Sequence, residues 1–467
     1  MPVSLQADYT LIDGTLRRDV VVAVGSDGRI AGVDASLDGQ APVGVQRLPG
    51  KVLVPGFVNA HSHSFQRLLR GRTEHQAIGA GDDDFWSWRA AMYRAASSLD
   101  PAAVQAVAAF TFAEMVKAGF THVAEFHYLH HQPDGTPYDD PLELTRRVLA
   151  GAEAAGIGAT LLRVAYQRGG AGVPLTAEQR RFVDPSPEAY ARALEDTEVL
   201  ARPGDRRPVH VGIAAHSVRA LDRTWLAALA ELSAGRLVHA HVSEQPGEIA
   251  QCLAEHGVRP VQLLADLGLL TDRFTAVHAT HLDPGEIRLL GDAAVTACIC
   301  PTTERNLGDG LPMLRELRAA GAHLAVGTDS HARIDPFAEL RALEDGERLR
   351  LGRRNVLLAG QGMGQGVAKT LFGVGSSGRA VGLPDGAIAV GQRADLVALS
   401  VDDPALDGVA EGPDGGHALG AALILGGGPR LVRDVWIGGE QVVSDGAHVR
   451  GDALRRDYRE VAARLWS

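Results

Sequence analysis

Cysteine is scarce in this sequence and long apolar segments are missing, and each absence excludes a class of protein. Three cysteines in 467 residues are too few for a disulfide framework, so a reducing compartment is the default. No apolar run has membrane-spanning length, and the first residues show no basic segment followed by an apolar one. We therefore expect a cytoplasmic protein with no membrane partner.

Basic residues are also fewer than acidic ones. Lysine and arginine number 46 against 57 aspartate and glutamate residues, which gives a formal net charge of −11. This sign disfavours nucleic acid as a partner. The remaining composition is that of an ordinary globular protein, and the length suffices for one large domain and a smaller one.

From about residue 52, β-type runs alternate with helical segments. Eight βα units in a row favour an α/β fold with a closed (β/α)8 barrel, a TIM-like barrel. An open doubly wound sheet would not readily bring the first and eighth strand ends together. The expected strands are Val52–Ala60, Thr121–Tyr128, Thr160–Tyr166, Val209–Ala215, Leu237–Val242, Thr275–Ala279, Val295–Cys300 and His323–Gly327. The expected helices are Ala102–Lys117, Pro187–Leu200, Arg223–Leu232, Gly247–Glu255, Pro284–Leu289, Pro312–Ala320 and Pro336–Leu349.

Both ends of the chain carry short β-type runs with glycine turns. We expect them to form one small β-sandwich domain from residues 1–55 and 370–467, with Asp395–Leu399 as a central strand. The barrel then takes residues 56–369. Its first connection, His61–Leu99, is long and is a candidate substrate lid.

Histidines and carboxylates fall at the expected strand ends. His61 and His63 are two residues apart, so on a strand they face the same side. In a barrel the chemistry sits at the carboxyl ends of the strands, so we predict one shared site. The other residues at strand ends are His241, Glu244, His278 and Asp329.

This set suits a metal-dependent hydrolase. His61, His63, His241 and Asp329 would hold one divalent ion, with Zn²⁺ favoured and Fe²⁺ as the alternative. The ion would lower the pKa of its water toward neutrality. A two-metal site often needs a modified lysine on the fourth strand, and residues 208–217 contain no lysine.

Three residues are the expected catalytic groups. Glu244 lies three residues after His241 and is placed to shuttle protons. His278 could stabilise a tetrahedral centre, and Asp329 could orient the water while it binds the metal.

Other histidines and the cysteines have simpler interpretations. We expect His127, His130 and His131 to be solvated loop residues. His216 ends the fourth strand, where a substrate contact and a structural role are equally compatible with its position. The residues interpreted as structural are His210, His239, Cys298 and Cys300.

Two longer stretches match a known superfamily. Val54–His63 matches the first-strand signature of the amidohydrolase superfamily, and Gly386–Val397 matches its composite β domain. The chain thus resembles the mononuclear deaminase branch over nearly its whole length. Narrower stretches resemble the formimidoylglutamate deiminases: His61–Arg67, Phe85–Arg89, Ala124–Tyr128, Cys300–Gly310 and Asp329–His331.

That resemblance implies hydrolysis of N-formimino-L-glutamate to N-formyl-L-glutamate and ammonia, in histidine degradation. It implies the same metal ligands, with acid–base and water-orienting roles for Glu244 and His278. We also expect a homodimer, since large barrels often form one. The substrate contacts that the resemblance implies are Gln66, Arg89, Tyr128, His216 and Arg219.

The chemistry of this substrate provides a separate check. It is a dicarboxylate with a cationic formimidoyl group, and guanidinium groups bind carboxylates bidentately. Arg89 and Arg219 would both reach the barrel mouth, which favours an acidic substrate over a purine. The alternatives are another deaminase, acting on a purine or a guanidino acid, and an inactive metal-binding scaffold protein.

Overall fold

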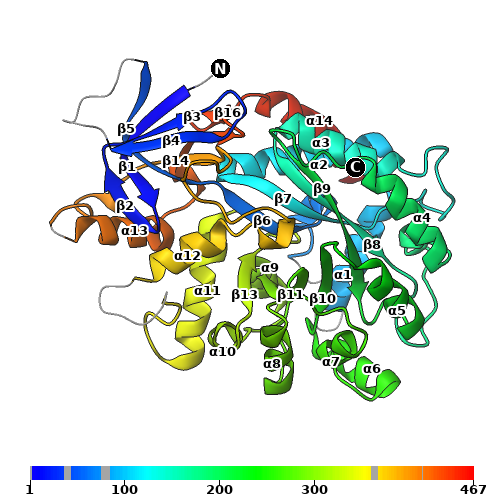
Figure 1. The fold of residues 1–467 in the computed structure, drawn as a ribbon. Coiled ribbons are helices and arrows are strands. Elements are labelled where there is room, and N and C mark those ends of the chain that lie inside the picture. Colours follow the sequence, from blue (N-terminus) through cyan, green and yellow to red (C-terminus); the bar gives the residue numbers. More distant parts are fainter. Residues whose placement is uncertain (1–2, 36–43, 75–84, 359–365, 413, 467) are drawn as a thin grey trace.

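The computed structural model describes residues 3–35, 44–74, 85–358, 366–412 and 414–466. An eight-stranded parallel barrel with surrounding helices lies beside a nine-stranded, mainly antiparallel sheet from both ends of the chain (Figure 1). The predicted fold class is confirmed. No helix in the described ranges has the length and apolar character needed to cross a membrane.

The barrel strands follow one another in chain order, each paired in parallel with the next. The first and last strands are joined at a seam, where Asp329 N donates to His61 O at 3.0 Å and His63 N donates to Asp329 O at 3.1 Å. Backbone pairing of these three residues therefore brings the two strand ends together. The strands are β6 (Phe57–Ser62), β7 (Phe120–His127), β8 (Gly158–Ala165), β9 (Val209–Ser217), β10 (Val238–Val242), β11 (Phe274–His278), β12 (Thr296–Ile299) and β13 (His323–Val326).

The first predicted strand is wrong in one respect, because the run Val52–Ala60 is divided at Gly56. Residues up to Pro55 belong to the terminal sheet, and β6 begins at Phe57. Gly56 N donates to Asp395 O at 2.8 Å, and a Cβ on Gly56 would lie 2.3 Å from Thr121 Oγ1. The chain thus passes between the two sheets where only glycine fits.

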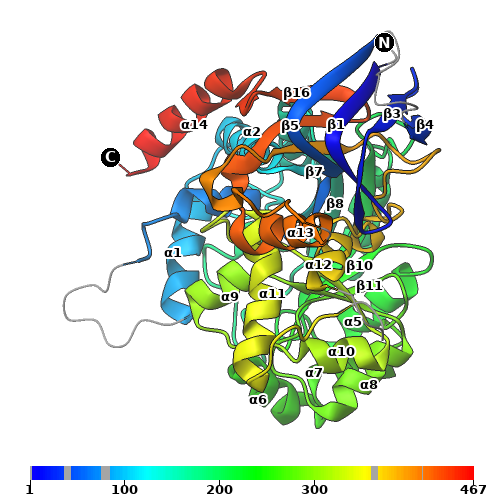
Figure 2. The ribbon, with the colours of Figure 1, turned by 90° about the vertical axis from the view of Figure 1, so that its left-hand side faces the viewer.

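Helices surround the barrel, and several begin with a polar cap followed by proline (Figure 2). Asp283 and Glu286, for example, form a capping box. The helices here are α2 (Pro101–Ala118), α3 (Glu143–Ala155), α4 (Pro187–Glu198), α5 (Arg223–Leu232), α6 (Pro246–His256), α7 (Pro260–Asp266), α8 (Pro284–Asp292), α9 (Pro301–Leu307), α10 (Leu314–Ala320) and α11 (Pro336–Leu351). Helix α3 was not expected, although Leu144, Val148 and Ala155 give it a buried apolar face.

The long first connection is partly helical. It contains the 3-10 helix η2 (Ser64–Leu69) and helix α1 (Phe85–Ser97), while its residues 75–84 lie outside the described part. Helix α1 carries Arg89, so this connection positions a predicted site residue.

The terminal sheet packs against the barrel through one face. On β5, Val52 and Val54 belong to the large barrel core, whereas Leu53 points to a separate small core with Leu396. Strand β14 pairs with β15 and β5, so its prediction as a central strand is confirmed. The sheet comprises β1 (Val3–Ile12), β2 (Thr15–Arg18), β3 (Val20–Val24), β4 (Ile30–Ala35), β5 (Val45–Pro55), β14 (Leu396–Ser400), β15 (Val432–Ile437), β16 (Glu440–Ser444) and β17 (Ala447–His448).

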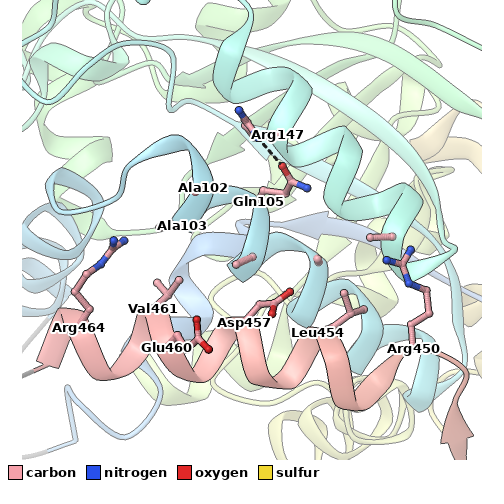
Figure 3. Close-up of a pocket in the computed structure, with 13 residues that line it drawn as sticks. Ala102, Ala103, Gln105, Arg147, Arg450, Leu454, Asp457, Glu460, Val461 and Arg464 are labelled. Carbon is pink, nitrogen blue, oxygen red and sulfur yellow. Dashed lines mark hydrogen bonds between the residues drawn. The ribbon is translucent and has the colours of Figure 1, made fainter.

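Three helices follow the barrel in sequence, namely α12 (Val367–Gly375), α13 (Gly415–Gly426) and α14 (Gly451–Trp466). Helix α14 packs on α2, and the two helices with α3 border a surface groove (Figure 3). Arg147 Nη1 donates to Gln105 Oε1 at 3.0 Å across it. None of the residues that line this groove is a predicted site residue.

Candidate active site

Four predicted metal ligands converge at the carboxyl end of the barrel. One potential ligand atom from each of His61, His63, His241 and Asp329 lies within 4.8 Å of the others, and all four residues are buried. His61 Nε2 lies 3.1 Å from both His63 Nε2 and His241 Nε2. Asp329 Oδ1 lies 3.4 Å from His61 Nε2 and 3.3 Å from His63 Nε2.

Backbone carbonyls orient two of these imidazoles. His63 Nδ1 donates to Phe126 O at 3.1 Å, and His241 Nδ1 donates to His216 O at 2.7 Å. In the neutral ring the opposite nitrogen, Nε2, is then a lone-pair donor toward the shared centre. Convergent imidazole lone pairs beside a carboxylate are the donor set of a divalent-metal site, and the carbonyls are its usual outer support.

Burial keeps these rings neutral. It lowers the pKa of His61 and of His63 well below 6.5, with neighbouring histidines acting in the same direction. Burial and then His278 lower the pKa of His241 to about 4. Neutral imidazole is the form that binds a metal, so the site needs no deprotonation step near neutral pH.

Glu244 and His278 lie beside this cluster. His278 Nε2 lies 3.5 Å from Glu244 Oε1 and 3.8 Å from Asp329 Oδ2. Burial raises the pKa of Glu244 to about 7, and the neighbouring His278 acts to lower it. A carboxyl group with a pKa near working pH can both accept and deliver a proton.

Glu304 holds the other side of the His278 ring. Its Oε1 lies 3.2 Å from His278 Nδ1 and accepts from Cys300 N at 2.8 Å. Burial acts to lower the pKa of His278, but Glu244 and Glu304 outweigh it and raise that pKa well above 6.5. Glu304 therefore both orients the ring and favours a proton on Nδ1.

Strained backbone marks the same strand ends. The φ angles of Ser243, His278 and Asp329 are 51°, 69° and 46°, in the left-handed region that non-glycine residues rarely adopt. Such strain concentrates at functional sites, where the surrounding fold holds it in place.

Two predicted substrate contacts touch each other. Gln66 Nε2 donates to Tyr128 Oη at 3.0 Å, and both residues are buried. Gln66 Oε1 has no hydrogen-bond partner among the described residues. The Tyr128 ring also contacts His63, at 5.2 Å between ring centroids, so Gln66 and Tyr128 border the histidine–aspartate cluster.

The two predicted arginines flank one tryptophan. Arg89 Cζ lies 4.6 Å from the centroid of the Trp86 ring, and Arg219 Cζ lies 5.4 Å from it. Both guanidinium groups have a buried Nη1 without a hydrogen-bond partner among the described residues. Buried unpaired donors of this kind suit an anionic ligand.

His216 lies against the predicted ligand His241. Its carbonyl orients His241, and its ring lies 5.0 Å from the His241 ring and 4.8 Å from that of Tyr166. Its Nδ1 is buried without a partner in the described ranges. The residue thus supports the cluster and also offers a polar atom beside it.

The interpretation of His127 and His130 as solvated loop residues is wrong, whereas His131 lies half-buried in the loop. His127 ends β7, and Arg181 O accepts from His130 N at 3.0 Å, so each of these two histidines is only 3% exposed. None of the three belongs to a potential metal cluster within the described residues. Cys298 and Cys300 are free and buried, as expected for packed core thiols.

Two buried acidic residues at the site were not anticipated, Glu304 and Asp309. Both lie in Cys300–Gly310, a stretch that the sequence marked only by its resemblance to the formimidoylglutamate deiminases. Their side chains turn back to the barrel mouth from α9 and the residues after it, which spacing along the chain does not reveal.

Comparisons with known proteins agree with this geometry. A model described as the amidohydrolase family matches residues 52–442. The chain belongs to this family. Formimidoylglutamate deiminase of Pseudomonas aeruginosa is 40% identical over 98% of both chains, and 8-oxoguanine deaminase of the same organism is 30% identical over 85% of this chain and 83% of that protein.

A solved structure is similar over the full length. The crystal structure of an amidohydrolase from Brucella melitensis covers 100% of both chains with 34% identity and a TM-score of 0.89. The resemblance to formimidoylglutamate deiminases is therefore confirmed. This amidohydrolase is a hydrolase that acts on carbon–nitrogen bonds.

Proposed function

We propose that this amidohydrolase hydrolyses N-formimino-L-glutamate to N-formyl-L-glutamate and ammonia, a step of histidine degradation. One observation carries the proposal: Arg89 and Arg219, which flank Trp86, each have a buried Nη1 without a hydrogen-bond partner among the described residues, and the charge of Arg89 acts on Glu244 and His216. The two guanidinium groups match the two carboxylates of this substrate. The 40% identical formimidoylglutamate deiminase supports the same substrate.

One divalent metal ion fits the cluster, with Zn²⁺ favoured over Fe²⁺ by three imidazoles and one carboxylate. His61, His63, His241 and Asp329 would hold it. When bound, such an ion lowers the pKa of water and so supplies a nucleophile near neutral pH. Strand β9 has no lysine for a bridging group, which favours a single ion.

The remaining chemistry belongs to residues of the chain. Glu244 takes a proton from the attacking water and delivers it to the departing nitrogen, so that ammonia leaves. Asp329 accepts a hydrogen bond from that water and fixes its direction of attack. His278, held by Glu304, stabilises the negative charge on the oxygen that attacks the formimidoyl carbon.

At the carboxylate end, Arg89 and Arg219 bind the substrate. Gln66, Tyr128 and His216 complete its contacts, since Gln66 Oε1 and His216 Nδ1 are buried and unpaired among the described residues. A purine would instead call for aromatic stacking and amide groups in place of two guanidinium groups. A cytoplasmic homodimer is the expected state of the enzyme, and sedimentation equilibrium tests the dimer.

Ammonia release decides between this function and its rivals. Purified, metal-loaded protein is given N-formimino-L-glutamate, and ammonia and N-formyl-L-glutamate are measured. We expect Glu244→Gln to lower kcat by about 10²–10⁴-fold, the usual contribution of a general acid–base group, with metal content unchanged. Wild-type protein that releases no more ammonia than Glu244→Gln would refute the proposal. Activity on a purine or a guanidino acid alone would favour the other deaminases.

A further inference from the structure

Asp309 has no role in the mechanism above, yet it lies beside its acid–base pair. Its side chain is buried, with 3% of the residue exposed. Asp309 N donates to Glu304 O at 2.9 Å, and Asp309 Oδ1 accepts from Gln245 Nε2. The other oxygen, Oδ2, is buried and has no hydrogen-bond partner among the described residues.

The position of this carboxylate points to a ligand. One carboxylate oxygen of Asp309, one of Glu244 and a nitrogen of His278 lie within 4.8 Å of one another. Leaving a buried carboxylate oxygen unpaired is costly, and a bound ligand that donates a hydrogen bond removes that cost. Asp309 is therefore placed to contact whatever reacts beside Glu244.

The charges around Asp309 define what kind of ligand fits. Burial and then Glu244 raise the pKa of Asp309 to about 8, and Glu304 and Asp329 act in the same direction. The neighbouring His278 acts to lower this pKa. An added cation would relieve this repulsion and favour the charged form of Asp309.

The site contains groups of both charges. One carboxylate oxygen of Glu244 and one of Asp309 lie within 4.8 Å of a nitrogen of His278, Glu304 contacts the other nitrogen of that ring, and the guanidinium groups of Arg89 and Arg219 lie around Trp86. The proposed substrate also has groups of both charges, a cationic formimidoyl group and two carboxylates. Asp329 is used as a metal ligand, whereas Asp309 Oδ2 has no partner among the described residues.

We propose that Asp309 binds the cationic formimidoyl group by accepting a hydrogen bond from its terminal nitrogen. This inference rests on the proposed function. Asp309 holds the departing nitrogen beside Glu244, where that nitrogen receives its proton. The same contact distinguishes the cationic substrate from the neutral formyl product, because a formyl oxygen has no hydrogen to donate.

Two ligands that differ in the head group test this contact. N-amidino-L-glutamate has a cationic head, and N-formyl-L-glutamate has a neutral one on the same dicarboxylate. Calorimetry on metal-loaded Asp309→Asn is expected to show about 10–100-fold weaker binding of the amidino ligand, the range of a charge-assisted hydrogen bond. Binding of the formyl ligand should change by less than about 3-fold, within ordinary mutational scatter.

Two further variants separate this role from a structural one. Asp309→Glu keeps the charge and is expected to recover most of the discrimination between the ligands. Asp335→Asn removes another buried carboxylate, which caps α11, and is expected to leave both affinities unchanged. Metal content is measured for every variant.

The outcomes are distinct. The inference would be overturned if Asp309→Asn weakened binding of both ligands equally, or weakened binding of neither. The proposed function would still hold in that case if the wild-type protein released ammonia from N-formimino-L-glutamate. A second metal ion in wild-type protein that disappears in Asp309→Asn would also overturn it, because Asp309 would then be a ligand. Wild-type protein that releases no ammonia from N-formimino-L-glutamate overturns both proposals.

Discussion

The two ends of the barrel both contain buried histidines, but the rings have different partners. His239 and His241 lie two residues apart on β10 and point to the same side. His239 Nε2 donates to Ala380 O at 2.8 Å, whereas His241 Nε2 lies 3.1 Å from His61 Nε2. Two residues along one strand separate a ring whose Nε2 donates to a backbone carbonyl from a ring whose Nε2 faces another imidazole.

The base of the barrel repeats the first pattern. His122 Nε2 donates to Thr160 Oγ1 at 2.8 Å, and that hydroxyl donates to Val381 O at 2.7 Å. The carbonyls belong to the short helix η4 (Arg379–Val381), which lies across the base. Burial alone therefore does not indicate a metal ligand. The distinguishing feature is a ring nitrogen that meets only other potential ligands.

Exchanging the two histidines of β10 for glutamine gives the largest expected effect. His241→Gln should lose the metal and lower kcat/KM by at least about 10³-fold, because the metal supplies the nucleophile. His239→Gln should keep its metal and most of its activity, and lose about 1–3 kcal/mol of stability through its altered buried hydrogen bond. Metal analysis, kinetics and chemical unfolding measure these effects. Equal metal loss in both variants would contradict the assignment of His241 as a metal ligand and of His239 as a structural residue.

Glu304→Ala tests the support of His278 at the mouth. We expect kcat to fall about 10–100-fold with KM and metal content nearly unchanged, as for other outer supports of site residues. Glu304→Gln should restore part of the activity, since its amide oxygen can still accept from His278 Nδ1. Thr160→Val is the matched change at the base and should lower stability only. A kcat loss of the same size in Thr160→Val would contradict this difference.

Arg89→Ala tests the outer rim of the mouth. Loss of a hydrogen bond to a charged group, worth about 1.5–3 kcal/mol, should raise KM roughly 10–100-fold with metal retained. Arg94→Ala on the same helix removes an exposed arginine and should change nothing. Initial rates over a range of N-formimino-L-glutamate concentrations show whether KM changes. Wild-type KM in Arg89→Ala would exclude this residue from substrate binding.

Acid should destabilise both ends, with metal protecting only the mouth. Burial lowers the pKa of His239 and of His241 from 6.5 to about 4. The unfolded chain then binds more protons than the folded one, so stability is present above pH 6.5 and is lost as pH falls toward 4. Thermal unfolding should show the metal-free protein losing several degrees across this window. The metal-loaded protein should still have a higher melting temperature than the metal-free protein at pH 5. Loss of this difference between pH 7 and 6 would contradict the expectation that the ligand histidines are neutral there.

The sequence allowed much of the fold to be predicted, because periodicity along a chain reflects local backbone geometry. Eight β-type runs separated by helical segments were sufficient for the barrel. The break at Gly56 was missed, since Val52–Ala60 is uniformly apolar and two sheets share it. The burial of His127 and His130 was missed because it depends on the packing of the distant Arg181.

For the site, the sequence by itself determined which side chains stand at strand ends, since alternation along a strand and the carboxyl-end rule are local. It therefore provided His61, His63, His241, Glu244, His278 and Asp329 as a set. Only the tertiary structure decided which nitrogens lack another partner, that Glu304 holds His278, and that Asp309 turns back beside Glu244. The physical reason is that hydrogen-bond satisfaction and desolvation depend on neighbours from distant strands, which sequence spacing does not encode.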